Sequence, residues 1–544
     1  MKRLVTFSTI LLIYFALTAC TTNNIVNLGY FDNYLIVAND ESQADEKWAD
    51  YLYNHLSNHT PVNKFIYRSF AIKDKCITIS VHVDSSLGCD YKIERERESI
   101  RLSANNEDNM LWLIYQFIAA AAEEDERFVN NDIPPAIIKL DNTQGTMAFE
   151  YRAIYSPTNS NEEMLPIRAT HHIDYNWGIW GHNIKKIVAD YDKDDIYAVQ
   201  NGKMTKEQYC FSSPSLYNIL DNYINDQFGK SGERITIMPN DNMIACTCHR
   251  CKAMGNTDKN ATPAVAALLT RLARKYPKHQ FFMTAYNTNL EPPAKDLPDN
   301  VGVMLSTFDI PMQCNFRNSK GLHTFQKRLD AWKSVAKLMY VWEYSQNFDD
   351  YLTPYPCLNI LQERFRYYKE QGIKGISING SGDDFSTFDE LHTYILSALL
   401  IDPDISVEDL TNKFCKQHYP LCYNMIAEYC LLLENKVKNE NRELPYYGTM
   451  QDNIDSYLNA EEFETFWTRL DKESKKADAD ERKQLSGMLT AMCYSRLELL
   501  KLNKIETEKR ADIIEILKNY KSVPHLLNYK ETNGSLEEYL KKNK

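Results

Sequence analysis

The chain has 544 residues, 44% of them hydrophobic and 25% charged, and its formal net charge is -12 at pH 7. This composition excludes an intrinsically disordered chain, and the length suits two or three globular domains. The acidic balance makes nucleic acid and anionic lipid surfaces poor partners.

The first twenty residues have the pattern of a bacterial lipoprotein signal. Lys2 and Arg3 precede an apolar run over residues 11–17, and the segment ends in Leu17-Thr18-Ala19-Cys20. We expect cleavage before Cys20, lipidation of that cysteine and a polar tether over residues 21–33. The tether starts without an acidic run, which favours an anchor in the outer membrane with the protein facing the periplasm. No later stretch approaches the ~20 apolar residues of a spanning helix, so the anchor is the only membrane contact expected.

Residues 34–145 predict a small α/β domain. Apolar runs indicate strands at 34–38, 76–83, 90–94 and 99–103, and helical spacing of apolar residues indicates helices at 44–56 and 109–122.

Residues 146–401 show a different rhythm, in which short β-branched runs alternate with longer helical patterns. This alternation is typical of a parallel sheet built from βα units, and eight strands in about 250 residues is the size of a (β/α)8 TIM barrel. The expected strands are 149–155, 167–175, 208–211, 234–238, 280–286, 301–305, 338–342 and 375–378. Residues 402–544 carry only helical patterns and predict a helical C-terminal domain.

Two carboxylates follow expected strands of this barrel. Asp241 comes after the fourth strand, and Glu343 lies at the end of the seventh, in Trp342-Glu343-Tyr344. Glycoside hydrolysis needs one carboxyl group that protonates the leaving oxygen and one that attacks or activates water. We therefore predict that Asp241 is the general acid and Glu343 the nucleophile or base.

Both carboxylates have structural alternatives. Asp241 could cap a turn, and Glu343 could pair with a nearby arginine. Three other carboxylates at the same face, Asp309, Asp383 and Asp384, could provide the base of an inverting enzyme.

Polar and aromatic residues near other strand ends are candidates for sugar binding. An arginine can hold carboxylates or hydroxyls in a bidentate manner, and aromatic rings can stack on a sugar. A buried arginine and packed tryptophans would explain the same residues. The predicted binding set is Arg152, His182, Trp180, Asn240, Tyr286, Trp342 and Asn379, and His171, His172 and Trp177 lie in the same segments.

Four cysteines could form one cluster, because Cys246, Cys248 and Cys251 follow the fourth strand and Cys210 ends the third. Four thiolates would suit a tetrahedral structural zinc, whereas an oxidising compartment would favour disulfides. The sequence leaves both alternatives open. No organic cofactor is expected.

An ordered series of motifs resembles a known family. The motifs include Gly181-His182, Gln208-Tyr-Cys210-Phe-Ser-Ser-Pro214, Pro239-Asn-Asp241, Tyr340-Val-Trp342-Glu-Tyr344 and Pro354-Tyr-Pro356. Together they look like a domain-of-unknown-function family of bacterial lipoproteins related to α-glucuronidases and other (β/α)8-barrel glycosidases. The resemblance implies a glucuronidase- or hexosaminidase-like N-terminal domain before the barrel. Glu343 departs from the aspartate expected there, which leaves retention or inversion open.

These observations predict a lipid-anchored glycoside hydrolase acting on complex glycans, including ones that contain uronic acids or amino sugars. The alternative is a glycan-binding lipoprotein that has the barrel but no turnover. The oligomeric state is not indicated.

Overall fold

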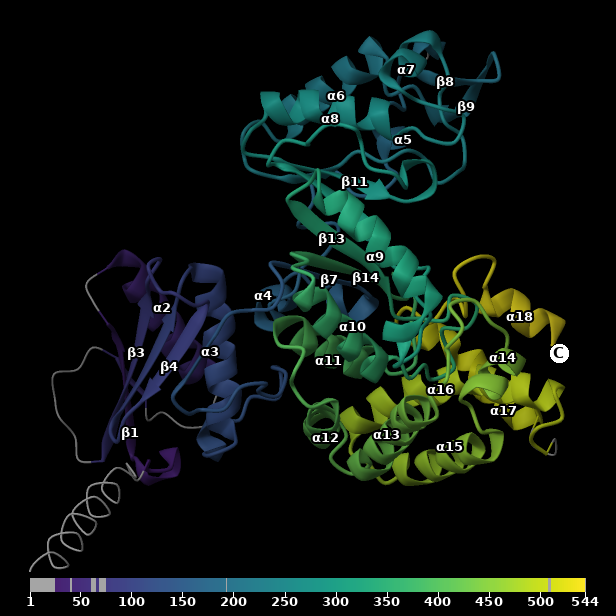
Figure 1. Ribbon diagram of the computed structural model, residues 1–544. Coiled ribbons are helices and arrows are strands. Elements are labelled where there is room, and N and C mark those ends of the chain that lie inside the picture. Colours follow the sequence, from purple (N-terminus) through teal and green to yellow (C-terminus); the bar gives the residue numbers. More distant parts are fainter. Residues whose placement is uncertain are drawn as a thin grey trace, which may run out of the picture. The chain divides into compact units, whose positions relative to one another are not determined.

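The computed structural model describes residues 25–39, 42–59, 65–67, 75–191, 193–506 and 510–543. The expected lipoprotein signal and Cys20 lie outside these residues and stay predictions. The chain divides into two compact units, Met1–Thr146 and Met147–Lys544 (Figure 1). Among the described helices, none is both long and apolar enough to span a bilayer.

The first unit is a six-stranded sheet in the order β2-β1-β3-β5-β4-β6. Strands β2, β1, β3 and β5 run parallel, and β4 pairs antiparallel with β5 and β6. The side chain of Asn106 caps helix α3 by accepting a hydrogen bond from the backbone N–H of Asn109, 2.9 Å away. The elements are β1 (Asn33–Ala38), α2 (Gln43–His59), β2 (Phe65–Tyr67), β3 (Cys76–Val83), β4 (Tyr91–Arg95), β5 (Ser99–Ala104), α3 (Glu107–Ala122) and β6 (Thr143–Gly145).

The second unit is built on a sheet of six parallel strands in the order β10-β11-β12-β13-β14-β7. Both faces of this sheet are covered, which explains why its strands consist of nearly continuous apolar runs. Their bounds are β7 (Tyr151–Tyr155), β10 (Arg234–Thr236), β11 (Gln280–Ala285), β12 (Val301–Ser306), β13 (Leu338–Tyr344) and β14 (Gly375–Asn379).

Aromatic side chains fill the space that this sheet encloses. The rings of Tyr151 on β7 and Tyr340 on β13 stack with centroids 5.5 Å apart, and Phe282 on β11 lies 4.5 Å from Tyr340. The guanidinium of Arg234, on edge strand β10, lies 5.2 Å from the ring centre of Tyr151, on the opposite edge strand. In a flat sheet, six strands spaced ~4.8 Å apart would hold the two edge strands roughly 24 Å apart. The contact between Arg234 and Tyr151 therefore requires the sheet to curl until its edges face one another.

Residues 171–179 contact both edge strands. His171 makes an isolated parallel bridge to Ala153 on β7, and Ile179 makes one to Ile235 on β10. This single segment, rather than two regular strands, lies beside the two edges of the curved sheet.

The expected eight-stranded barrel is therefore present only in part. The predicted strand at 167–175 overlaps the end of helix α4 (Met164–Arg168) and has only the bridge at His171. The predicted strand at 208–211 overlaps β9 (Lys203–Tyr209), which pairs antiparallel with β8 (Tyr197–Gln200) in a separate sheet. Asn201 and Gly202, with φ of 52° and 78°, form the tight turn of this hairpin.

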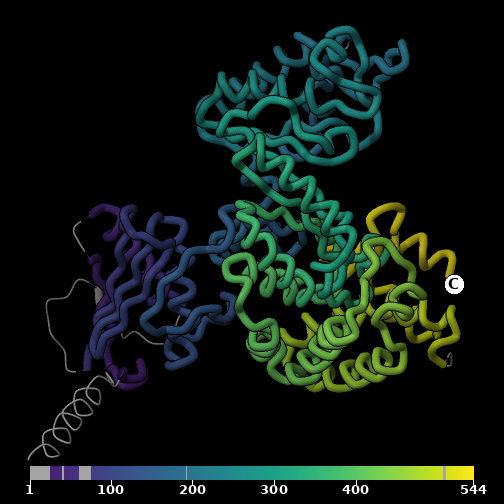
Figure 2. The backbone as a smooth tube through the Cα atoms, in the orientation of Figure 1, coloured from purple at the N-terminus to yellow at the C-terminus, as the bar shows by residue number. Residues whose placement is uncertain are grey.

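Helices follow most strands of the second unit, and Figure 1 shows α10 and α11 beside β14 and β7. Residues beyond 402 continue the same compact unit with a succession of helices, green to yellow in Figure 2. The helices are α4, α5 (Ile184–Ile187), α6 (Pro214–Gln227), α7 (His249–Met254), α8 (Thr262–Lys275), α9 (Lys320–Lys333), α10 (Leu358–Glu370), α11 (Asp389–Ile401), α12 (Val407–His418), α13 (Tyr423–Glu440), α14 (Met450–Ser456), α15 (Ala460–Ser474), α16 (Ala479–Lys501), α17 (Arg510–Leu517) and α18 (Leu536–Lys542).

Candidate active site

Strand register decides which side chains point into the curved sheet at its carboxyl end. Tyr344, Asn379 and Tyr155 are neighbours in register at the ends of β13, β14 and β7. They share the face of Tyr340 and Tyr151, which fill the interior, because side chains two residues apart lie on one face of a strand. Half-buried Asn379 therefore lies at the mouth, where the sequence predicts it.

Glu343 points to the other face, toward the helices. Its side chain is fully buried, and its Oε1 lies 2.6 Å from the guanidinium of Arg364 on α10, which is also fully buried. It further accepts hydrogen bonds from Thr307, from the backbone N–H of Tyr344 and from the hydroxyl of Tyr368. Burial alone would lower the pKa of Arg364, but the Glu343 carboxylate, Tyr446 and Tyr368 together raise this pKa above its usual value. The geometry supports the arginine-pairing alternative and contradicts the prediction of a nucleophile at the mouth.

Asp241 lies in the loop after β10 and is exposed. The side-chain amide of Asn287, which follows β11, donates a hydrogen bond of 2.8 Å to its carboxylate. Burial and then the charge of Asp241 raise the pKa of the neighbouring Tyr286, which is 38% exposed. Asp241 and Tyr286 thus lie together at the carboxyl end of the sheet, accessible to a ligand.

The loop of Asp241 is held by polar contacts to β9. The side-chain amide of Gln208 donates to the carbonyl of Asn240 at 3.0 Å and accepts from the backbone N–H of the same residue at 3.0 Å. The side chains of Asn240 and Asn242 both donate to the carbonyl of Glu207. Asn240, a predicted binding residue, therefore orients the loop.

Two tryptophans form a stacked pair within the second unit. The rings of Trp180 and Trp342 are 5.1 Å apart and nearly parallel, with an interplanar angle of 23°. Both are half-buried and pack on the aromatic core of the curved sheet. The pair joins two predicted binding residues that are 162 positions apart in the chain.

A second group of aromatic rings lies next to Tyr344. Phe308, after β12, stacks on Tyr446 at 4.9 Å and lies 6.3 Å from Tyr447. Phe308 and Tyr447 are 43% and 52% exposed, and the Tyr447 hydroxyl donates to Glu531. Sequence patterns missed Tyr446, Tyr447 and Glu531, because they come from loops of the helical segment beyond residue 402. A rich aromatic content was the only available signal.

Asp383 and Asp384 follow β14. Burial and the charges of Asp383, Asp174 and Asp384 raise the pKa of Tyr155 at the mouth. Asp383 is exposed, whereas Asp384 is half-buried and accepts a hydrogen bond of 2.9 Å from the amide of Asn528. Burial and the negative charge of Asp383 raise the pKa of Asp384.

A chain of electrostatic effects connects these carboxylates with Asp241. Burial, then Glu531 and Asp349, and last Tyr286 raise the pKa of Tyr447, and Asp241 in turn raises the pKa of Tyr286. Burial, then Glu531, Asp384 and Tyr447, raises the pKa of Tyr351. Asp241 and Asp384 therefore lie at the two ends of a run of neighbouring tyrosines, namely Tyr286, Tyr447 and Tyr351.

Three other predicted residues are occupied elsewhere. Arg152 is buried and donates to the carbonyls of Ala169 and Phe149, so its guanidinium stabilises backbone and does not face the mouth. A ring nitrogen of His182 contacts the carbonyl of Pro239, which fixes the loop before Asp241. Asp309 forms a 2.9 Å ion pair with Arg328. The prediction that Arg152 binds sugar is contradicted, because Arg152 alternates along β7 with Tyr151 and Ala153, whose side chains fill the interior, and so points to the opposite face.

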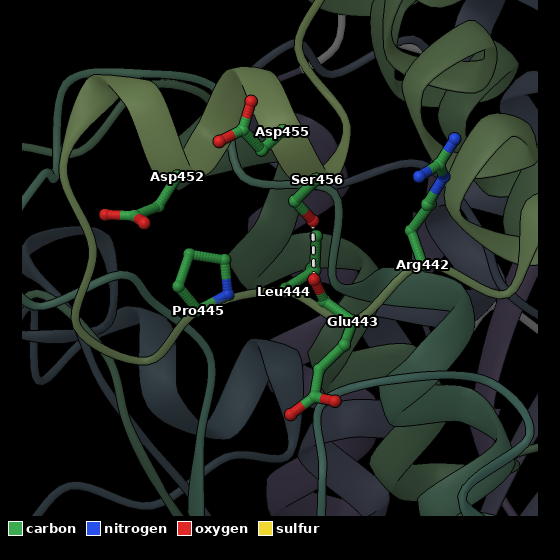
Figure 3. A pocket seen from close by; sticks show the side chains of 7 residues that line it. All are labelled: Arg442, Glu443, Leu444, Pro445, Asp452, Asp455 and Ser456. Carbon is green, nitrogen blue, oxygen red and sulfur yellow. Dashed lines mark hydrogen bonds between the residues drawn. The ribbon is translucent and has the colours of Figure 1, made fainter.

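A cavity of about 410 Å³ lies between residues 442–445 and helix α14 (Figure 3). Its polar groups are engaged in local structure. Asp452 completes the capping box of α14 with Thr449, and Ser456 donates to the carbonyl of Glu443. No strand of the curved sheet contributes to its lining.

The predicted cysteine cluster is assembled. Cys210, Cys246, Cys248 and Cys251 are free thiols whose sulfur atoms all lie within 4.8 Å of one another. These residues could hold a metal ion.

Comparisons with known proteins identify a family but no activity. A search of curated proteins finds no match. One similar solved structure is described as a GH138 enzyme targeting pectin rhamnogalacturonan II, with 10% identity, a TM-score of 0.46, and coverage of 93% of this chain and 78% of that chain. A likeness this low carries no argument about substrate or mechanism. Residues 133–430, more than half of the 544, match the model of a domain of unknown function, DUF4838. The chain therefore belongs to the DUF4838 family.

Proposed function

We propose that the protein is a glycoside hydrolase that acts on complex glycans, including ones with uronic acids or amino sugars, at the carboxyl end of the curved sheet. The observation that carries this proposal is that accessible carboxylates and exposed aromatic rings follow the strands of the curved sheet at the same end. Tyr286, Phe308 and Tyr447 are each more than a third exposed, Tyr286 lies beside Asp241, and Phe308 lies 6.3 Å from Tyr447.

Aromatic rings suit sugars because a ring can stack on the apolar face of a pyranose while its edge stays hydrated. The Tyr286 hydroxyl can donate to a sugar oxygen, and the Tyr447 hydroxyl, which donates to Glu531, can accept from a sugar hydroxyl. The stacked pair of Trp180 and Trp342 provides a rigid apolar surface in the same unit.

Two carboxyl groups would perform the chemistry. Asp384 is half-buried beside Asp383, and its raised pKa favours the protonated form that a general acid needs. Asp241 is exposed and accepts from Asn287, which suits a carboxylate that attacks the sugar or activates water. This assignment moves Asp241 from acid to base or nucleophile and replaces Glu343 by Asp384.

The test is a glycan hydrolysis screen of the full chain beside Asp241→Asn and Asp384→Asn, with released reducing sugar as the readout. Both variants should lose roughly 100-fold or more in rate, as expected when one carboxyl group of a pair is removed. The matched control is Asp299→Asn, because Asp299 lies just before β12, at the opposite end of the sheet, in an exposed pair with Lys337. It should keep full activity.

Full activity in Asp384→Asn would reject its role as acid. A wild-type protein that binds glycans without hydrolysing any of them would instead support the alternative of a glycan-binding lipoprotein. NMR of the first anomer released would separate retention from inversion.

A further inference from the structure

We infer that Cys210, Cys246, Cys248 and Cys251 bind one structural zinc ion, and that this ion holds the loop of Asp241 in place. The four cysteines come from two segments, one directly after β9 and one around the start of α7. Their sulfur atoms form a mutual cluster within 4.8 Å, and Cys210, Cys246 and Cys251 are buried while Cys248 is half-buried.

The sulfur spacing fits tetrahedral coordination. Zinc–thiolate bonds of about 2.3 Å in a tetrahedron place the sulfur atoms about 3.8 Å apart. The sulfur of Cys210 lies 3.7 Å from that of Cys248 and 3.8 Å from that of Cys251. A disulfide would require about 2.05 Å and would join the sulfurs in pairs.

Hydrogen-bond donors also point at the sulfurs. The backbone N–H of Val199 donates to Cys246 at 3.3 Å, and that of Cys251 donates to Cys248 at 3.4 Å. The hydroxyl of Ser212 lies 3.0 Å from the sulfur of Cys251 and 3.3 Å from that of Cys210. Such donors stabilise the negative charge that four thiolates place around a divalent ion, and they orient the ligands.

Four protein ligands leave no open position, so the ion would be structural and not catalytic. The ion would also act on the loop of Asp241, because Cys210 lies close in sequence to a residue that holds this loop. Gln208, two residues earlier, holds Asn240 by two hydrogen bonds, and the other three cysteines end the same loop. The ion would therefore tie both ends of the segment that carries Asp241. This second step rests on the proposed function.

The site is tested by the metal content of the full chain. Inductively coupled plasma mass spectrometry should find about one zinc per chain after purification or after addition of zinc sulfate. Cys251→Ser should lower the zinc content roughly fivefold or more, because a three-thiolate site binds more weakly. Cys89→Ser, which changes a half-buried cysteine of the first unit, should leave it unchanged.

A wild-type measurement covers the case in which Cys251→Ser does not fold. Replacement of the zinc by Co²⁺ should give the intense visible bands of tetrahedral thiolate coordination. A chain that takes up neither ion, or that retains disulfides among these cysteines in mass spectrometry without reductant, would overturn the site.

The bracing role has its own readout. Removal of zinc by a chelator should increase hydrogen exchange of the backbone amides over residues 237–248, whether or not any glycan is hydrolysed. Unchanged exchange in zinc-free protein would refute the bracing role, and a failure of the glycan screen would leave the metal measurements intact.

Discussion

The substitution Glu343→Gln separates the structural role of this residue from the catalytic role that its sequence position predicts. The carboxylate and the guanidinium of Arg364 are both 0% exposed and 2.6 Å apart. Glutamine keeps the volume and can still accept from Thr307 and Tyr344, but it leaves the buried guanidinium without a counter-charge. Removing one partner of a buried ion pair costs about 3–5 kcal/mol, a large part of the ~5–15 kcal/mol that stabilises a typical protein.

Urea unfolding followed by tryptophan fluorescence measures this loss as a lower transition midpoint. The matched control is Glu370→Gln, which breaks the exposed pair with Arg317 and should cost less than about 1 kcal/mol. The double variant Glu343→Leu/Arg364→Met, which replaces both charges by apolar groups, should recover most of the stability. A Glu343→Gln protein with wild-type stability and no glycan hydrolysis would refute the structural role.

Three further predictions follow from other contacts. Burial raises the pKa of Glu434 to about 7, so the native state binds this proton more tightly than the unfolded chain does. The free energy of unfolding should therefore fall by up to about 3 kcal/mol as the pH rises from ~4.5 to ~7. Glu434→Gln should flatten this fall in urea titrations at pH 5 and 8, and an equal slope in both proteins would contradict the assignment. A Cβ on Gly375 would lie 2.7 Å from the Tyr340 ring, so Gly375→Ala should cost about 1–3 kcal/mol, whereas Gly88→Ala, with open space around it, should cost little. Tyr447→Ala should raise KM roughly 2- to 10-fold with little change in kcat, and Tyr30→Ala, an exposed tyrosine of the first unit, should change neither.

The strands of the curved sheet were predictable where the chain carries continuous β-branched or apolar runs, as in β11, β12 and β14. The predictions failed at residues 167–175 and 208–211, where polar residues interrupt the pattern. Asn201-Gly202 is the strongest short hairpin signal in this region, and it explains why the following strand joins β8 and not the parallel sheet.

The placement of Glu343 could have been deduced from strand alternation alone. Adjacent residues of a strand point to opposite faces, so Trp342 and Glu343 cannot both face one site. Once the interior face contains the aromatic residues of β13, Glu343 must face the helices, where Arg364 meets it. The same rule turns Arg152 away from Tyr151 and Ala153 on β7.

The parts of the site that sequence patterns could not locate come from long-range folding. Tyr446, Tyr447 and Glu531 reach the mouth from loops between helices, and no local pattern ties them to β12 or β13. The backbone N–H of Phe348, just after β13, donates to the carbonyl of Tyr446 at 2.8 Å, and that of Glu531 donates to the carbonyl of Phe348 at 2.9 Å. These two bonds fasten the helical segment directly to the loop that follows the seventh expected strand. Changes in the helical segment should therefore alter glycan recognition, even though its sequence has only the features of a solvated helical domain.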